Sequence, residues 1–381
     1  KQIRVCRVKK MEMMLLEECC EILDSMRIPI TASNRKEGIY PYYGANGIQD
    51  HVADYIFDDE LVLLAEDGGN FGSKTRPIAY RVSGKCWVNN HAHVLKPKEG
   101  LNVDFLCYSL MFYNTEGLVN GATRQKLTQT TMRKMLIPNL SIENQLYIVN
   151  QLNKLLKIIE LRKKEIQQLD NLTKARFVEM FGDPVANDKG WKMKPLLDMG
   201  KCKNGMNFHY DDSGVEISCL GVGDFKDLSV IDNTKKLSIV SLNEMPSEEY
   251  LLKDGDIVFV RSNGNKDLVG RSLAIYPGKL PTTFSGFCIR YRIHDDEITV
   301  PYLLRVLKME SMRKKMAGRG ANIQNLNQQI LGTLVIPVPP IELQNQFVDF
   351  VRAIDKSKVA VQKALDETQI LFDSLMQKYF G

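Results

Sequence analysis

The histidines and cysteines are the first residues to test for chemistry, because their side chains bind metal ions and act as acids, bases and nucleophiles. His91 and His93 flank Ala92, and Cys86 lies nearby in the sequence. A metal site needs three or four ligands, and no second cluster accompanies this one. We therefore expect no metal site, and instead a strand on which the two histidines face the same way.

The signatures of several enzyme classes are missing. Residues 68–74 (GGNFGSK) only superficially resemble a nucleotide-binding loop. Neither the zinc-binding pair H-E-x-x-H nor the nucleophile turn G-x-S-x-G occurs. Residues 337–340 (PVPP) lack the polar residue with which amino-methyltransferases hold the target amine, and residues 221–223 (GVG) lack the third glycine of a dinucleotide fingerprint. We expect a chain that has no catalytic activity and binds no cofactor itself.

Basic residues are concentrated between positions 305 and 324. Six lysines and arginines face a single acidic residue there, Glu310, which gives this segment a net charge of +5. They are Arg305, Lys308, Arg313, Lys314, Lys315 and Arg319. Two interpretations stay open: a solvated helix face with its loop, or a surface that contacts phosphates and displaces counterions from DNA.

Size and composition indicate a soluble protein of two domains. The chain has 381 residues, of which 44% are hydrophobic and 25% charged, and one core rarely exceeds about 250 residues. No apolar run is long enough to span a membrane, and the basic segment 1–10 lacks the apolar block of a signal peptide. The eight cysteines form no C-x-x-C pair. We expect a cytoplasmic protein with reduced, mostly buried cysteines.

The most informative feature is a duplication. Residues 125–182 match residues 324–381 at an offset of 199 without a gap, with 14 of 58 positions identical. Upstream, residues 61–65 (LVLLA) resemble residues 257–261 (IVFVR), and both runs read as short buried strands that lead to a glycine-containing loop. The chain therefore consists of two related halves.

Each half ends in a long helical stretch, residues 142–180 and 341–380. Apolar residues there recur in steps of four and three, which places one narrow seam along each helix. The seam comprises Ile148, Leu152, Leu155, Ile159, Arg162, Ile166 and Leu169 in the first helix, and Phe347, Val351, Ile354, Lys358, Val361, Leu365, Thr368, Phe372 and Leu375 in the second. We predict an antiparallel coiled coil of helices about 55 Å long; the alternative is two core helices of separate domains.

The predicted fold is mixed α/β, with two strand-rich domains separated by the two helices. The predicted boundaries are a first domain at residues 1–141, a central helix at 142–182, a second domain at 183–340 and a C-terminal helix at 341–381. If the helices pair antiparallel, an approximate two-fold axis relates the halves. Two such bodies could contact two segments of DNA, as two-fold DNA readers do.

Two related motifs, residues 136–145 (LIPNLSIENQ) and 335–344 (VIPVPPIELQ), each lead into a long helical stretch. They are supported by residues 40–47 (YPYYGANG), 180–184 (MFGDP), 190–191 (GW), 255–258 (GDIV) and 379–381 (YFG). Together with the duplication, these motifs resemble the specificity subunit of type I restriction–modification systems. Their order and duplication cover nearly the whole chain. The first half departs from the pattern at residues 58–61 (DDEL), where the usual Gly-Asp pair is missing.

The resemblance implies a DNA-binding subunit with two target-recognition domains, each reading one half of a split site. The helices would set the spacing between the halves and dock two modification subunits, which bind S-adenosylmethionine and methylate adenine. Motor–nuclease subunits that use ATP and Mg²⁺ could join this core. The alternative function is a helical scaffold whose two domains bind other proteins.

Within the resemblance, polar and basic loop residues are the candidates for contacting DNA, since Arg suits guanine and Asn or Gln suits adenine. In the first domain they are Asn70, Ser73, Lys74, Arg76, Asn89, Asn90, His91, Arg124, Gln125 and Lys126. In the second they are Arg261, Asn263, Lys266, Arg271, Lys314, Lys315, Arg319, Asn322, Gln324 and Asn325. Lys314 and Lys315 suit phosphates better than bases. Each residue could alternatively stabilise a loop or turn.

Overall fold

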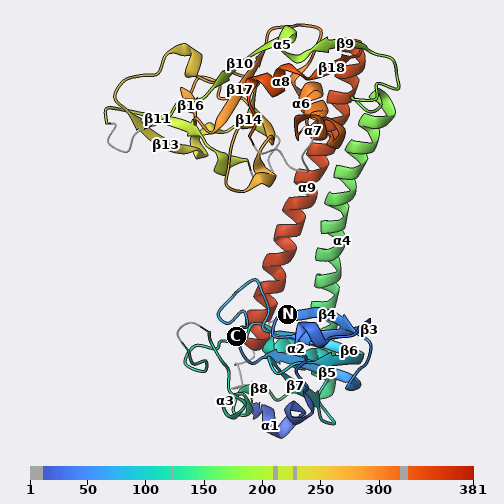
Figure 1. The fold of residues 1–381 in the computed structure, drawn as a ribbon. Coiled ribbons are helices and arrows are strands. Elements are labelled where there is room, and N and C mark those ends of the chain that lie inside the picture. Colours follow the sequence, from blue (N-terminus) through green and yellow to red (C-terminus); the bar gives the residue numbers. More distant parts are fainter. Residues whose placement is uncertain (1–11, 122–123, 209–212, 226–229, 318–324) are drawn as a thin grey trace, which may run out of the picture. The chain divides into compact units, whose positions relative to one another are not determined.

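The computed structural model describes residues 12–121, 124–208, 213–225, 230–317 and 325–381 (Figure 1). The chain forms two compact units. Unit 1 contains residues 1–165 and 361–381, and unit 2 contains residues 166–360. Each unit therefore includes one end of each of the two long helices.

The core of unit 1 is a six-stranded sheet in the order β2-β7-β5-β6-β3-β4, in which only the β3–β6 pair is parallel. Its strands are β2 (Cys20–Ile22), β3 (Glu37–Gly44), β4 (Gly47–Val52), β5 (Phe57–Ala65), β6 (Ala79–Val88) and β7 (Ala92–Pro97). The smaller elements are β1 (Met13–Leu15), α1 (Leu16–Cys19), η1 (Asp24–Met26), η2 (Ala32–Asn34), α2 (Val103–Met111), α3 (Gln129–Arg133) and β8 (Leu136–Pro138). The apolar run in β5 is fully buried, and β6 and β7 pair with the two edges of this strand.

Unit 2 has a five-stranded sheet in the order β10-β17-β14-β15-β12 and a separate three-stranded sheet, β13-β11-β16. The strands are β9 (Lys192–Pro195), β10 (Gly200–Asn204), β11 (Val215–Leu220), β12 (Val230–Ile231), β13 (Ser238–Leu242), β14 (Asp256–Val260), β15 (Ser272–Ile275), β16 (Thr282–Phe284), β17 (Cys288–Ile293) and β18 (Val335–Val338). The helices are α5 (Leu196–Met199), α6 (Val300–Lys308), α7 (Glu310–Ala317), α8 (Gln328–Gly332) and the 3-10 turns η3 (Val222–Asp224), η4 (Thr234–Lys236), η5 (Glu248–Tyr250) and η6 (Lys266–Leu268). The mixed α/β class predicted from the sequence is confirmed.

The two main sheets share one topology. Strands β2, β7, β5, β6 and β3 occupy the same order in unit 1 as β10, β17, β14, β15 and β12 in unit 2. One backbone hydrogen bond fixes the correspondence: Leu127 N–H donates to Glu66 O (2.7 Å), and Leu326 N–H, its match in the second repeat, donates to Arg261 O (2.8 Å). Glu66 thus corresponds to Arg261, one residue away from the alignment predicted from the two apolar runs.

The departure at residues 58–61 has a structural counterpart. In unit 2, Asp256 is buried and accepts two hydrogen bonds of 2.7 Å from the guanidinium of Arg292. The corresponding residue of unit 1 is Leu61, which is fully buried. In unit 1 the acidic residue is instead Asp59, whose carboxylate lies 2.8 Å from Lys96 Nζ. A buried apolar side chain thus replaces a buried ion pair.

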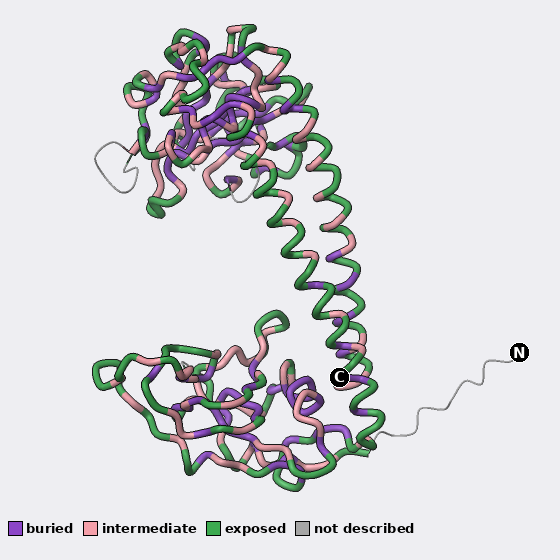
Figure 2. The backbone as a smooth tube through the Cα atoms, turned by 90° about the vertical axis from the view of Figure 1, so that its right-hand side faces the viewer, coloured by how far each residue is buried: buried purple, intermediate pink, exposed green. Residues whose placement is uncertain are grey.

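The long helices are α4 (Ile142–Phe181) and α9 (Ile341–Phe380). In unit 2 they run antiparallel, because Phe177 packs on Phe347 (ring centroids 5.4 Å apart) while Asp170 pairs with Lys358 (2.7 Å). Every seam residue predicted from the heptad spacing is buried or half-buried, and Figure 2 shows the rest of both helices mostly exposed. The predicted antiparallel helix pair is confirmed.

The polar residues of the seam bind the opposite helix within each unit. In unit 1 the guanidinium of Arg162 donates to the backbone oxygen of Ala364 and to the hydroxyl of Thr368. In unit 2 the Lys358–Asp170 pair has the same role. Polar pairs at seam positions favour one register over slipped alternatives.

A buried glutamine connects each helix to its own domain. Gln145 is 1% exposed. Its Oε1 accepts from Asn102 N–H (2.8 Å), and its Nε2 donates to the carbonyls of Gly100 (3.0 Å) and Leu140 (2.8 Å). The first turn of α4 is thereby fastened to the loop that begins α2.

Unit 2 repeats this arrangement at the matching position of the second repeat. Gln344 is fully buried. Its Oε1 accepts from Thr299 N–H (2.8 Å), and its Nε2 donates to the carbonyls of Glu297 (2.8 Å) and Pro339 (2.9 Å). We refer to these two arrangements as the glutamine clamps.

Replacing a clamp residue should therefore destabilise its unit. Gln145→Ala leaves one N–H and two carbonyls without their partner, which we expect to lower the free energy of unfolding by about 2–3 kcal/mol. Thermal unfolding followed by circular dichroism measures this effect. Gln168→Ala, at an exposed position of the same helix, is the matched control; an equal shift in both variants would contradict a specific role for the clamp.

Candidate nucleic-acid interface

In each unit the segment that precedes α3 or α8 runs beside the end of a buried strand. In unit 1 this approach segment is residues 124–127. Besides the bond from Leu127 to Glu66, Gly68 N–H donates to Gln125 O (3.1 Å), and Lys126 and Asn120 exchange two backbone bonds (2.7 and 2.9 Å). In unit 2 the described part of the equivalent segment is Asn325 and Leu326. The duplicated motif thus lies at the same place on both sheets.

Arg124 is held in a defined orientation at the surface. Its side chain is 58% exposed. Its Nη2 donates to Asp67 Oδ1 (2.8 Å), and His91 Nδ1 lies 2.5 Å from the same oxygen. The guanidinium lies over Gly68, where a β-carbon would sit only 3.2 Å from Arg124 Nε. The result is an exposed, oriented fork of N–H donors, which suits bidentate hydrogen bonding.

Beneath the approach segment of unit 1, acidic and basic side chains neutralise one another. Glu66 binds Arg27 Nη1 (2.6 Å) and Lys126 Nζ (3.0 Å). Burial alone would raise the pKa of Glu66, but hydrogen bonds from Arg27 and Lys126 outweigh it and lower the pKa. The carboxylate is therefore ionised and neutralised by its neighbours.

The equivalent strand end of unit 2 carries a basic residue. Arg261 stands where unit 1 has Glu66, and its Nη1 donates to Gly286 O (3.4 Å). Asn263 is half-buried, and its Oδ1 accepts from Asn265 N–H (2.8 Å), so it shapes the loop. Lys266 and Asn325 are exposed. The two strand ends therefore make the same backbone hydrogen bond but carry different charges.

Several predicted residues of unit 1 shape loops. Ser73 Oγ accepts from Arg76 N–H (2.9 Å), and Asn70 Nδ2 donates to Pro77 O (3.4 Å). Asn89 is only 3% exposed; its amide donates to Gln49 (3.1 Å) and accepts from His91 N–H (2.8 Å). Asn89 therefore stabilises the turn, and we withdraw it from the candidates for base contact. Lys74, Arg76, Asn90 and Gln125 are exposed.

The sequence matches the family described as the type I restriction modification DNA specificity domain, at residues 8–171 and again at residues 188–368. The chain belongs to this family. The two matches correspond to the two halves of the duplication.

Relatives and solved structures agree. A predicted type I restriction enzyme specificity subunit of Haemophilus influenzae is 28% identical over 377 residues, covering 96% of this chain and 92% of the relative. The StySPI specificity subunit of Salmonella potsdam is 24% identical over 84% of this chain and 74% of its own. The S subunit from M. genitalium has the same fold, with a TM-score of 0.58 at 16% identity and coverage of 100% and 98%. None of the helices in the described ranges is long and apolar enough to cross a membrane.

In this specificity-domain chain the basic stretch of unit 2 divides into two kinds of residue. Lys314 and Lys315 are exposed, and Lys314 pairs with Glu310 (2.7 Å). Arg305, Lys308 and Arg313 are instead half-buried, so neither of the two predicted interpretations covers the whole stretch. Burial, followed by the charges of Arg305 and Arg271, lowers the pKa of Lys308 to about 8.

Three predicted residues of this stretch, Arg319, Asn322 and Gln324, lie outside the described residues. Arg271 is half-buried. Its Nε donates to Asp267 O (3.3 Å) and its Nη1 to Phe225 O (3.4 Å), both on neighbouring loops.

The described residues include one group with the composition of a metal site. Asp24, Glu66 and His93 present oxygen and nitrogen atoms within 4.8 Å of one another. Both ring nitrogens of His93 are already hydrogen-bonded, and Arg27 binds both Asp24 and Glu66. Protein cations thus neutralise these acids. Cys86, named in the sequence analysis, is not part of this group.

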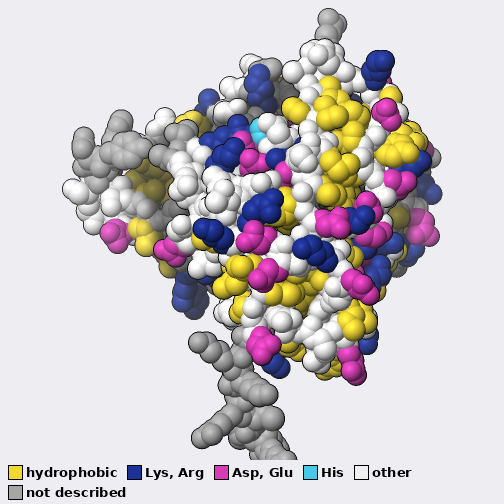
Figure 3. Space-filling view, turned by 90° about the horizontal axis from the view of Figure 1, so that it is seen from below, with side chains coloured by type: hydrophobic (Ala, Val, Ile, Leu, Met, Phe, Trp, Pro, Cys, Tyr) yellow, Lys and Arg dark blue, Asp and Glu magenta, His cyan; other side chains and the backbone are white. Residues whose placement is uncertain are grey.

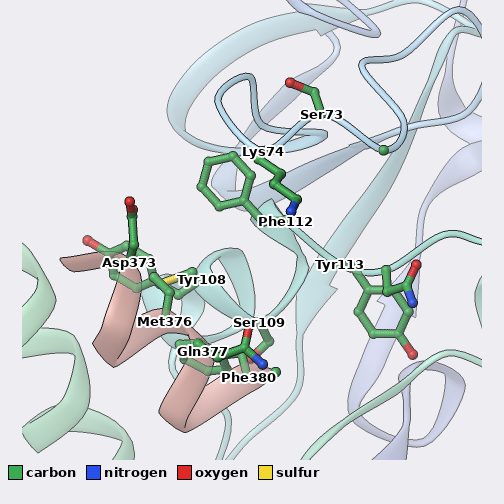
Figure 4. Close-up of a pocket in the computed structure, with 13 residues that line it drawn as sticks. Ser73, Lys74, Tyr108, Ser109, Phe112, Tyr113, Asp373, Met376, Gln377 and Phe380 are labelled. Atoms are coloured by element: carbon green, nitrogen blue, oxygen red, sulfur yellow. The ribbon is translucent and has the colours of Figure 1, made fainter. Parts of the chain in front are cut away.

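Unit 1 also contains an open cavity of about 520 Å³ near two predicted residues. Figure 4 shows Ser73 and Lys74 on one side and Tyr108, Met376 and Phe380 on the other. The lining residues are Gly72, Ser73, Lys74, Tyr108, Ser109, Phe112, Tyr113, Asn114, Asp373, Met376, Gln377, Phe380 and Gly381. Lys74 and Asp373 are the charged members of this set. On the face in Figure 3, basic and acidic side chains are interspersed among the described residues.

The half-buried Lys308 yields a prediction about stability. The folded protein disfavours protonated Lys308, because its pKa of about 8 lies below the ordinary lysine value of about 10.4. This cost is fully present below pH 8 and disappears as the pH rises to about 10.4.

Lys308→Met should therefore raise the free energy of unfolding at pH 7, by about 1–3 kcal/mol, with the gain shrinking above pH 8. Thermal unfolding at pH 7 and pH 10 checks this. Lys315→Met, at an exposed position, should change little at either pH. A destabilised Lys308→Met at pH 7 would show that the charge is well accommodated.

Proposed function

We propose that this chain is the DNA-recognition subunit of a type I restriction–modification complex and has no catalytic activity of its own. In this proposal units 1 and 2 each read one half of a split DNA site. The observation that carries it is the duplication, because the same approach segment lies beside the same strand end in both units. Two equivalent surfaces on one chain suit a site of two parts.

The unequal edges suit two different half-sites. Unit 1 presents the oriented guanidinium of Arg124 beside Asp67, whereas unit 2 presents Arg261 and Asn325. Arg is suited to guanine and Asn to adenine in the major groove. Lys315 and Lys266 are exposed, and their long, flexible side chains suit phosphate contacts that position the duplex.

The helices are proposed to hold partner subunits and to set the spacing of the half-sites. Leu172 is 48% exposed and Leu371, its match in the second repeat, is 50% exposed. Exposed leucine at the same position of both repeats supports two copies of one partner. We propose two modification subunits that bind S-adenosylmethionine and methylate adenine in the cytoplasm. Restriction subunits that use ATP and Mg²⁺ would complete the complex.

The alternative is a scaffold whose domains bind other proteins, for which the paired helices would serve equally well. Salt dependence distinguishes the two functions, since binding to phosphates weakens steeply with added salt. A scaffold should show no salt-sensitive preference for a split DNA site.

Mapping of methylated adenines tests the proposal directly. DNA from cells carrying the system is sequenced for methylation, with and without this chain. We expect a two-part motif that disappears when the chain is absent. Unchanged methylation, or methylation by the purified chain alone, would exclude a non-catalytic recognition subunit.

Substitution at the two kinds of contact should separate base reading from phosphate binding. Arg124→Ala should weaken discrimination at one half-site by tenfold to a hundredfold, because a good bidentate base contact contributes about 1–3 kcal/mol. Lys315→Ala should weaken binding to all duplexes similarly and reduce the slope of log K against log salt by about 1. Binding assays on duplexes with either mapped half scrambled measure both effects; equal loss at both halves in Arg124→Ala would rule out a base contact.

A further inference from the structure

A buried polar pair lies under the first approach segment. His93, on β7, is 0% exposed and Asp24 is 7% exposed. His93 Nδ1 lies 2.7 Å from Asp24 Oδ2, and His93 Nε2 lies 2.9 Å from the carbonyl oxygen of Leu127. Leu127 is the last residue of the segment that carries Arg124.

The proton positions follow from the partners. A carbonyl oxygen only accepts, so Nε2 of His93 carries a hydrogen and donates it to Leu127. The other ring nitrogen, Nδ1, faces Asp24 Oδ2. Leu127 N–H meanwhile donates to Glu66 O (2.7 Å). Both backbone groups of Leu127 are therefore held, one by the end of strand β5 and the other by His93.

The carboxylate of Asp24 accepts hydrogen bonds from the elements that surround His93. Its Oδ1 accepts from Val94 N–H (2.9 Å), and its Oδ2 accepts from Gln129 Nε2 (2.8 Å). Burial would raise the pKa of Asp24, but hydrogen bonding and charge from His93 outweigh it and lower the pKa. Arg27 also lies 3.5 Å from this carboxylate. The histidine ring is thus fixed by a carboxylate that joins β7 and α3.

At the positions equivalent to Asp24 and His93, unit 2 has uncharged side chains. Gln328, which matches Gln129 in the second repeat, donates to Asn204 Oδ1 (3.3 Å). Asn204 thus stands where unit 1 has Asp24. The strand pairings place Ile289 where unit 1 has His93, because Phe259 faces Ile289 as Leu64 faces His93. Isoleucine has no donor, so the side chain at this position gives Leu326 no such tether.

We propose that His93, held by Asp24, is a positioning residue for base reading by unit 1 alone, acting through its hydrogen bond to Leu127. The inference rests on the proposed function. Leu127 connects to Arg124 through only two residues, so a shift of this backbone moves the guanidinium. Both side chains are buried beneath the segment, so their effect on base reading would pass through Leu127.

Two double variants isolate the tether. Asp24→Asn with His93→Ile reproduces the uncharged chemistry of unit 2 and removes the donor to Leu127. Asp24→Asn with His93→Gln is equally uncharged but retains an amide N–H in place of Nε2–H. Both variants avoid a buried unpaired charge, which would itself destabilise the fold. Ile289→Val in unit 2 is the control for substitution at the equivalent strand position.

The experiment measures Kd for the mapped duplex and for two variants of it, one with the first half scrambled and one with the second half scrambled. Discrimination at each half is the Kd of the scrambled duplex divided by the Kd of the intact duplex. Full-length protein is used, with thermal unfolding in parallel. We expect the His93→Ile double variant to lose about tenfold in discrimination at the half read by unit 1, comparable to one mismatched base pair. The second half should be unaffected, and the His93→Gln double variant should stay within about twofold of the wild type.

Three results would overturn the proposal. The two double variants could discriminate equally well, both halves could weaken together, or only the unfolding temperature could change. Absence of site-specific binding by the wild-type chain would instead contradict the proposed function itself, so the two failures are distinguishable.

Discussion

The fold depends on satisfying buried backbone groups where a 40-residue helix leaves a domain. Each clamp glutamine satisfies one N–H and two carbonyls in a place that water does not reach. The clamp fastens the first turn of each helix to the loop before α2 or α6 in its own unit. The start of each long helix is therefore joined to its unit by hydrogen bonds as well as by chain connection. Because the clamp recurs at the matching position of both repeats, the two units have the same joint.

The two units fill the same buried position with different polar side chains. Gln129 and Gln328 donate from the same place, yet their acceptors are Asp24 in one unit and Asn204 in the other. The acid brings with it His93, Arg27 and Glu66, whereas the amide needs no counter-charge. A duplicated backbone has therefore been kept while its polar interior diverged. Recognition surfaces can differ in the same way, because only the backbone register must be preserved.

Much of the architecture could be predicted from the sequence, since heptad spacing and a gapless repeat are strong local signals. Strand register could not: residues 61–65 of β5 and all of β14 are buried on both faces, so no alternation marks which residue faces which. The network around His93 was also missed, because its hydrogen-bonded partners are 34 to 105 residues apart and only the fold brings them together. Asn89 shows the opposite error, since a polar residue next to a turn satisfies its own backbone as readily as it contacts a ligand.

The unequal charge of the two strand ends has a kinetic consequence. Arg124 and Lys126 share their charge with Asp67 and Glu66, whereas Arg261 stands at the same backbone position as Glu66. A more positive surface attracts a polyanion over longer range and raises the rate of encounter. In the proposed function, unit 2 would attract a duplex over the longer range, and unit 1 would hold it through donors that are already oriented. Encounter and retention would then depend on different units of one chain.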